Sequence, residues 1–179
     1  MVSFRTTGFT LVELIIAISV LAILSVLSIV TYNGIINNNY LKSATADVES
    51  IANATKLYAA HYDNYPPDVS RDIPAEVKQF MDSQDDIDDW PNAPWPSSVF
   101  DYDHWTINGV DTVQISVRFC PAGGPLSACK FPKESWASGF GVNSAFYYCI
   151  KGNCRSHSAE AATYPGYCVN CPNHTAVGT

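Results

Sequence analysis

The chain has 179 residues, a length that suits one compact domain together with an extended anchor. Its formal net charge is −7, and because nucleic-acid binding needs clustered Lys and Arg, we expect no direct contact with nucleic acid. The charge is uneven: residues 63–111 carry 12 acidic and 2 basic residues, whereas residues 112–179 carry 2 acidic and 5 basic residues. Simple solvation explains this pattern; the alternative is contact between the acidic part of one copy and the basic part of another.

A long apolar run, from Phe9 to Val30, follows a short leader of residues 1–8 whose one basic residue is Arg5. As a helix this run would be roughly 33 Å long, enough to cross a hydrocarbon layer about 30 Å thick. We therefore expect residues 9–30 to form a transmembrane segment, with the positive leader on the cytoplasmic side.

The apolar run contains one carboxylate, Glu13. An unpaired carboxylate in lipid is costly, so this group should have a partner. No Lys or Arg lies between Arg5 and Lys42, so the helix itself offers no cation. If the chain were cut after Gly8, Phe9 would gain a free ammonium group, and this group on a neighbouring copy is the partner that we expect for Glu13.

The stretch that ends the leader and opens the apolar run, Gly8 followed by Phe9-Thr-Leu-Val-Glu-Leu14, resembles the class III signal of type IV pilins and type II secretion pseudopilins. The resemblance covers residues 1 to about 63. It implies that a prepilin peptidase removes residues 1–8 and N-methylates Phe9, and that Glu13 neutralises the N-terminus of a neighbouring copy during assembly. It also implies the pilin fold, with an assembly platform protein and an assembly ATPase as partners.

One long helix, residues 9–62, is predicted to be the spine of the protein. Its second half is amphipathic, with an apolar stripe that should pack on the globular part of the chain. A kink would fall near Gly34 or residues 37–39, and Pro66-Pro67 cannot continue the helix. The stripe consists of Tyr40, Leu41, Ala44, Val48, Ile51, Ala52, Thr55, Tyr58, Ala59 and Tyr62.

The remaining residues, 63–179, are predicted to form a globular head. A short helix from about Ile73 to Ser83 would have Asp72 as its N-cap and would bury Val77, Phe80 and Met81. Asn108-Gly109 between two extended runs predicts a hairpin, and residues 144–150 predict a further strand. The expected fold is α+β: the spine helix packed on a small antiparallel sheet of three or four strands, with the apolar face of residues 113–119 against the helix.

An acidic stretch, residues 82–89, lies between the short helix and the first strand. Its carboxylates could supply oxygen ligands for Ca²⁺, but they lack the spacing of a calcium loop. We expect a solvated acidic loop, with a calcium site as the alternative, and no other cofactor. The candidate ligands are Asp85, Asp86, Asp88 and Asp89.

Six cysteines lie in the last third of the chain, and an even number in an exported domain indicates disulfides. Pairing between neighbours in sequence is the simplest arrangement, but a bridge between the third or fourth cysteine and the last two is also open. A zinc site or a redox pair is the less favoured interpretation of the last four. The cysteines are Cys120, Cys129, Cys149, Cys154, Cys168 and Cys171.

The sequence therefore predicts a structural subunit rather than an enzyme. The chain would insert once into the cytoplasmic membrane and then polymerise through its spine helix into an extracellular type IV pilus, a helical homopolymer. A type II secretion pseudopilin or minor pilin is the near alternative. A membrane-anchored, Cys-rich binding or redox protein is the distant one.

Overall fold

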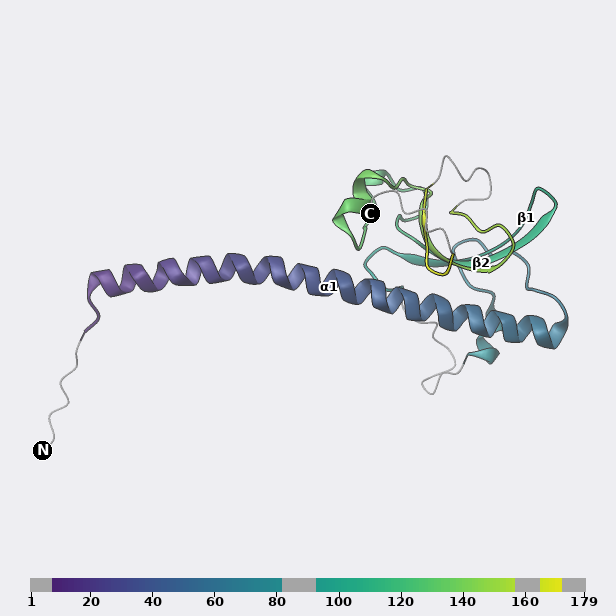
Figure 1. Cartoon of the computed structure of the whole chain (residues 1–179), viewed down its shortest axis with the longest axis horizontal. Helices are drawn as coiled ribbons and strands as arrows, with labels where there is room; N and C mark the ends of the chain where they lie inside the picture. The colour runs from purple at the N-terminus through teal and green to yellow at the C-terminus, as the bar shows by residue number, and fades with distance from the viewer. Residues whose placement is uncertain (1–7, 82–92, 157–164, 172–179) are drawn as a thin grey trace, which may run out of the picture. The chain divides into compact units, whose positions relative to one another are not determined.

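The computed structural model describes residues 8–81, 93–156 and 165–171, and it has the predicted α+β class (Figure 1). The chain divides into two compact units, Met1–Asn38 and Asn39–Thr179. The helices are α1 (Leu11–Tyr62) and three 3₁₀ helices, η1 (Ala75–Phe80), η2 (Leu126–Ala128) and η3 (Glu134–Ser138). The strands are β1 (Val99–Ile107), β2 (Val110–Arg118), β3 (Ala145–Lys151) and β4 (Tyr167–Cys168).

Helix α1 is one continuous helix that contributes to both units. Gly34 and residues 37–39 all belong to the helix, so the helix ends at neither position. The helix stops at Asp63, whose φ of 55° lies in the left-handed region, and Pro66-Pro67 follows three residues later.

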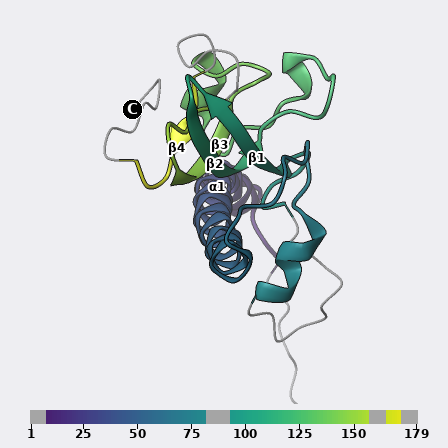
Figure 2. The same cartoon turned by 90° about the vertical axis from the view of Figure 1, so that its right-hand side faces the viewer.

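The core of the second unit is formed by side chains of α1 and of the sheet, and the end-on view in Figure 2 shows the sheet lying over α1. From α1 the core takes most of the predicted stripe, of which Ala44, Val48 and Ile51 are fully buried, whereas Tyr62 at the end of the stripe is exposed. From β2 and the residue after it, the core takes every second side chain, as predicted: Val113, Ile115, Val117 and Phe119. Burial of each such aliphatic side chain contributes about 1.5–3 kcal/mol, so this two-layer contact accounts for much of the stability of the unit.

The sheet has four strands in the order β1-β2-β3-β4. The predicted hairpin joins β1 to β2, and both turn residues have positive φ, 52° at Asn108 and 77° at Gly109, as a tight two-residue turn requires. Strand β3 pairs antiparallel with β2, but β4 pairs parallel with β3. This parallel pair departs from the predicted antiparallel sheet.

The short helix after α1 differs from the prediction. It is a 3₁₀ helix that begins at Ala75, because Pro74 is still extended with ψ of 125°. The cap position therefore falls on Pro74, which makes no side-chain cap, and Asp72 instead accepts a hydrogen bond from the N–H of Ile73 at 2.8 Å. Of the predicted apolar face only Val77 is fully buried; Phe80 and Met81 are half-buried.

Candidate assembly site

The first turn of α1 holds Glu13 in a capping box. The N–H of Thr10 donates to Glu13 Oε2 at 2.9 Å, and the hydroxyl of Thr10 donates to the same oxygen at 2.7 Å. The N–H of Glu13 in turn donates to Thr10 Oγ1 at 3.2 Å. These bonds satisfy two of the N–H groups that a helix start leaves free, so the carboxylate fixes where the helix begins.

Thr10 is the functional residue that the interpretation of the sequence missed. A Thr followed three residues later by Glu, directly before an apolar run, is the sequence signature of a capping box, so the signal was present. The box engages Oε2 of Glu13, and among residues 8–81, 93–156 and 165–171 no hydrogen bond reaches Oε1. One carboxylate oxygen is thus available to an outside donor.

The predicted cleavage position, Gly8, and Phe9 directly precede this cap. Gly8 has no positive φ, and a Cβ added to it would have no neighbour within 4 Å. The local fold therefore gives no reason for a glycine at this position. The side chain of Phe9 is 88% exposed in the single chain.

The first half of α1 presents apolar side chains on all of its faces. An α-helix that is apolar all round is normally surrounded by lipid or by other helices. Two hydroxyls within this run donate to carbonyl oxygens of their own helix, Ser19 to Ile15 O at 2.8 Å and Ser25 to Leu21 O at 2.7 Å, so neither needs water as an acceptor. The exposed apolar residues are Leu11, Val12, Leu14, Ile15, Ile16, Ile18, Val20, Leu21, Ile23, Leu24 and Val26.

Within the part of the chain that the structure describes, no helix qualifies by length and hydropathy as a candidate membrane span.

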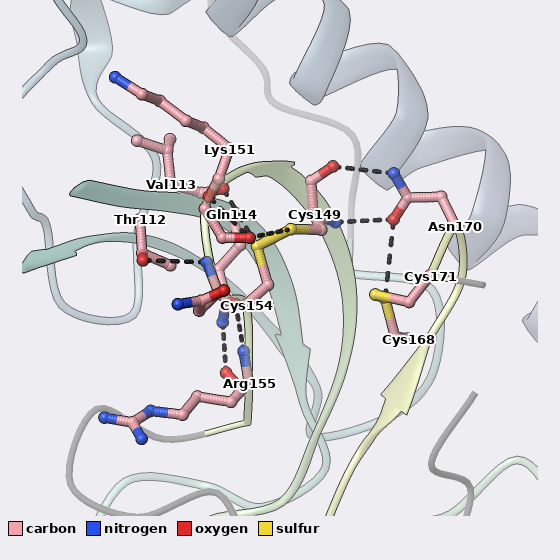
Figure 3. The surroundings of a disulfide bond; sticks show 12 residues. Thr112, Val113, Gln114, Cys149, Lys151, Cys154, Arg155, Cys168, Asn170 and Cys171 are labelled. Carbon is pink, nitrogen blue, oxygen red and sulfur yellow. Dashed lines mark hydrogen bonds between the residues drawn. A yellow bond between two sulfur atoms is a disulfide. The ribbon is translucent and has the colours of Figure 1, made fainter. Parts of the chain in front are cut away.

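The disulfides of the head join neighbours in sequence: Cys120 to Cys129, Cys149 to Cys154, and Cys168 to Cys171. This is the simplest of the pairings that the sequence left open, and it leaves no free cysteine. The side-chain amide of Asn170 links the last two disulfides. It accepts from the N–H of Cys149 and donates to the C=O of Cys149, both at 2.8 Å, and so takes the place of a strand residue beside β3 (Figure 3).

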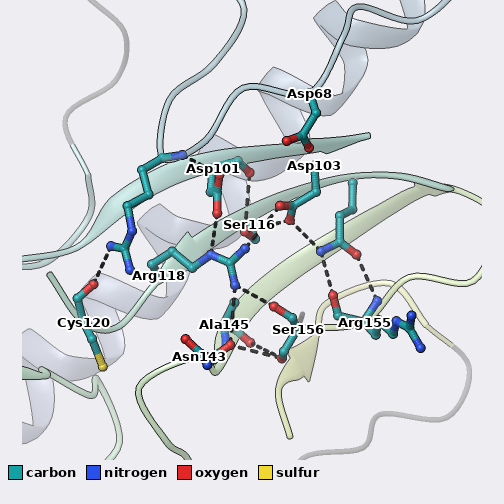
Figure 4. Close-up of polar contacts among 12 residues, drawn as sticks. Asp68, Asp101, Asp103, Ser116, Arg118, Cys120, Asn143, Ala145, Arg155 and Ser156 are labelled. Carbon is teal, nitrogen blue, oxygen red and sulfur yellow. Dashed lines mark hydrogen bonds and ion pairs between the residues drawn. The ribbon is translucent and has the colours of Figure 1, made fainter. Parts of the chain in front are cut away.

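The second face of β2 is buried as well, in a polar cluster of the head (Figure 4). The guanidinium of Arg118 pairs with Asp101 through Nε and with Asp103 through Nη2, the latter at 3.2 Å. Nη1 of the same guanidinium donates to the carbonyl oxygen of Ser156 at 2.6 Å. Burial raises the pKa of the Asp103 carboxyl well above its usual range, although the positive charge of Arg118 opposes the shift.

The candidate calcium ligands, Asp85, Asp86, Asp88 and Asp89, lie outside the described residues. Among the residues that the structure does describe, no group of three or more His, Cys, Asp or Glu side chains could hold a metal ion.

The N-terminal site has a counterpart in known proteins. Residues 4–29 match the prokaryotic N-terminal methylation motif, which is the class III signal of type IV pilins and pseudopilins. The match includes Gly8, Phe9, Thr10 and Glu13, and it supports a type IV pilin-like or pseudopilin protein, a structural class rather than an enzyme family. No curated protein and no solved structure matches the chain.

Proposed function

We propose that this chain is a pilin subunit that is cut after Gly8, methylated on Phe9 and polymerised through α1 into an extracellular type IV pilus. The observation that carries the proposal is the position of Glu13 at the start of a helix whose first half is apolar on every face. A single copy gives this surface no partner within the described residues. Other copies of the helix would cover it in a filament, and lipid would cover it in the cytoplasmic membrane before assembly.

The capping box gives Glu13 two separate tasks. Oε2 stays on Thr10 and fixes the first turn, while Oε1 accepts the ammonium group of Phe9 from a neighbouring copy. Cleavage after Gly8 leaves the N–H of Thr10 intact, so the box survives processing. The ion pair sets the register between copies. Most of the cohesion comes from side-chain packing, because lipid and a helical core have similar polarity.

The partners follow from the motif and the proposed assembly. A prepilin peptidase acts on the leader, and a platform protein and an ATPase move the subunit from the membrane into the filament. The head would face outward on the cell surface, where its disulfides suit an oxidising environment.

Glu13→Gln and Glu13→Ala separate the two tasks of the carboxylate. Glutamine keeps an oxygen for the capping box but carries no charge, whereas alanine removes both. We expect both variants to reach the membrane and to lose filament assembly, measured as subunit recovered by shearing relative to subunit in the membrane. The matched control is Thr10→Val, which removes the capping hydroxyl and keeps the charge; it should still assemble. Normal filaments from Glu13→Gln would show that the cap alone suffices and would remove the proposed ion pair.

A pseudopilin or minor pilin remains the second candidate, because the methylation motif is common to both groups. The two roles differ in abundance, since a major pilin makes up most of its filament. Identification of the main protein in sheared filaments decides between them. The Cys-rich binding or redox protein has less support, because all six cysteines are paired.

A further inference from the structure

The segment that follows α1 carries exposed carboxylates and runs beside the edge of β1 that faces away from β2. The N–H of Tyr102 in β1 donates to Asp72 O at 2.9 Å, and the N–H of Val69 donates to Tyr102 O at 3.4 Å. Further along β1, the N–H of His104 donates to Asp68 Oδ1 at 2.9 Å. Because β2 occupies the other side of β1, this segment lies on the outer edge of the sheet.

Three acidic side chains of this segment are exposed: Asp68 and Asp72 beside β1, and Glu76 on η1, whose Phe80 packs on Tyr58 and Tyr62 of α1. Lys78, which is half-buried, lies on η1 as well. The one arginine of the segment, Arg71, does not neutralise them at the surface. Its Nη1 donates to the carbonyl oxygen of Cys120 at 2.7 Å, so the guanidinium turns toward the sheet. We refer to Asp68, Asp72 and Glu76 as the acidic edge.

The opposite border of the head carries an exposed ammonium group. Lys133 Nζ lies 5.3 Å from the ring centre of Trp136 and 5.9 Å from that of Tyr167, which belongs to β4. These cation–π contacts hold the charge beside β4. Lys130, three residues earlier along the chain, is also exposed and carries a second positive charge. We refer to Lys130 and Lys133 as the basic edge.

The strand order separates Asp68 and Asp72, beside β1, from Lys133, beside β4, by the width of the sheet, because β1 and β4 are the outermost strands that the structure describes. Figure 2 shows η1, which carries Glu76, and β4 on opposite sides of the head. Patches on opposite sides cannot both lie in one two-fold interface. They can meet only head to tail, when one copy presents the acidic edge and the next presents the basic edge, and such contacts propagate along a polymer.

We propose that the acidic edge of one head contacts the basic edge of the next copy in the filament, and that this contact sets the orientation of the heads. The inference rests on the proposed polymerisation and adds a second, electrostatic contact to the packing of α1. Opposite charge at such a contact favours the head-to-tail arrangement and opposes the pairing of like edges.

Charge reversal tests the contact in the full-length chain. Glu76→Lys and Lys133→Glu should each lower the ratio of sheared filament to membrane subunit by about fivefold or more, because like charges then face each other between copies. The chain with both substitutions restores the complementarity, and its ratio should return to within about twofold of the unchanged protein. A purely local role of either side chain would not be rescued by the other substitution.

Two matched variants isolate the reversal from local effects. Glu76→Gln and Lys133→Gln remove one charge each, and Lys133→Gln also removes the contact with the two rings. Both should assemble better than the reversed variants. The contact would be overturned if the single reversals assembled normally, or if the double variant assembled less well than either single reversal. The proposed function would still stand in that case, provided that the unchanged protein forms filaments. If the unchanged protein forms no filaments, the proposed function fails first.

Discussion

Two carboxylates of this chain occupy opposite environments. Glu13 is exposed in the single copy and shares its Oε2 with the first turn of α1. Asp103 is buried and accepts from Arg118, from Gln114 Nε2 at 2.8 Å and from Ser116 Oγ at 3.3 Å. The first carboxylate is free to take part in assembly, whereas the second holds the head together.

The raised pKa of Asp103 makes the stability of the head depend on pH. The folded state retains a proton on this carboxyl at pH values where the unfolded state has lost it, so the free energy of unfolding falls as pH rises above about 4. The slope from one such group is at most about 1.4 kcal/mol per pH unit. Urea unfolding of the full chain in detergent between pH 5 and 8 measures it.

Asp103→Asn should flatten this slope, because the amide does not titrate. The free energy of unfolding itself can drop, since the amide is a poorer acceptor for Gln114 Nε2. Glu76→Gln, which removes an exposed carboxylate, is the matched control and should keep the slope of the unchanged protein. An equal slope in all three proteins would contradict the assignment to Asp103.

The sequence predicted the burial of one face of β2 but not the burial of the other. Alternation placed Val113, Ile115 and Val117 on the core side, and the structure confirms them. The same pattern could not show that Gln114 and Ser116 are buried too. Their cover comes from distant residues: the N–H of Arg155 donates to Gln114 Oε1 at 3.0 Å, and Gln114 Nε2 donates to Arg155 O at 2.8 Å.

At the scale of elements, β4 depends on how closely the chain approaches β3. Gly166 directly precedes β4, and a Cβ there would overlap Ser156 Oγ and lie 2.7 Å from Ala145 O. These neighbours are themselves fixed, since Ser156 Oγ accepts from the N–H of Ala145 at 3.3 Å. Only glycine therefore lets β4 reach its parallel partner.

Gly166→Ala should destabilise the head by about 1–3 kcal/mol, because an added methyl group must displace backbone at β3. Gly141→Ala is the matched control, since a Cβ at Gly141 meets nothing within 4 Å, and it should change stability by less than about 0.5 kcal/mol. Urea unfolding of both variants at one pH gives the comparison. Equal stability of the two variants would contradict the close approach.

Helices and strands were predictable where neighbouring residues in the sequence determine them. Asn108-Gly109 predicted the β1–β2 hairpin, because the two-residue turn needs positive φ at both positions and Asn and Gly are among the few residues that adopt it readily. The prediction that Asp72 is the N-cap of the short helix was wrong, because Pro74 is still extended and the helix begins after it. The parallel pairing of β4 was not predictable, since it depends on contacts between residues far apart in the sequence, such as the one between Asn170 and Cys149.

At the scale of the whole molecule, the two units suit two tasks. The unit of residues 1–38 carries the methylation motif and the apolar half of α1, and the unit of residues 39–179 carries the sheet, the core and the disulfides. In the proposed filament, the first unit supplies the contact between helices and the second supplies the contact between head edges.

Mass spectrometry of the N-terminus of the surface material released by shearing tests the central claim most directly. The proposed function predicts a chain that begins at Phe9, carries one methyl group on its amine and is recovered in filaments. A surface protein that still begins at Met1, or one that remains in the membrane as a monomer, would contradict the claim.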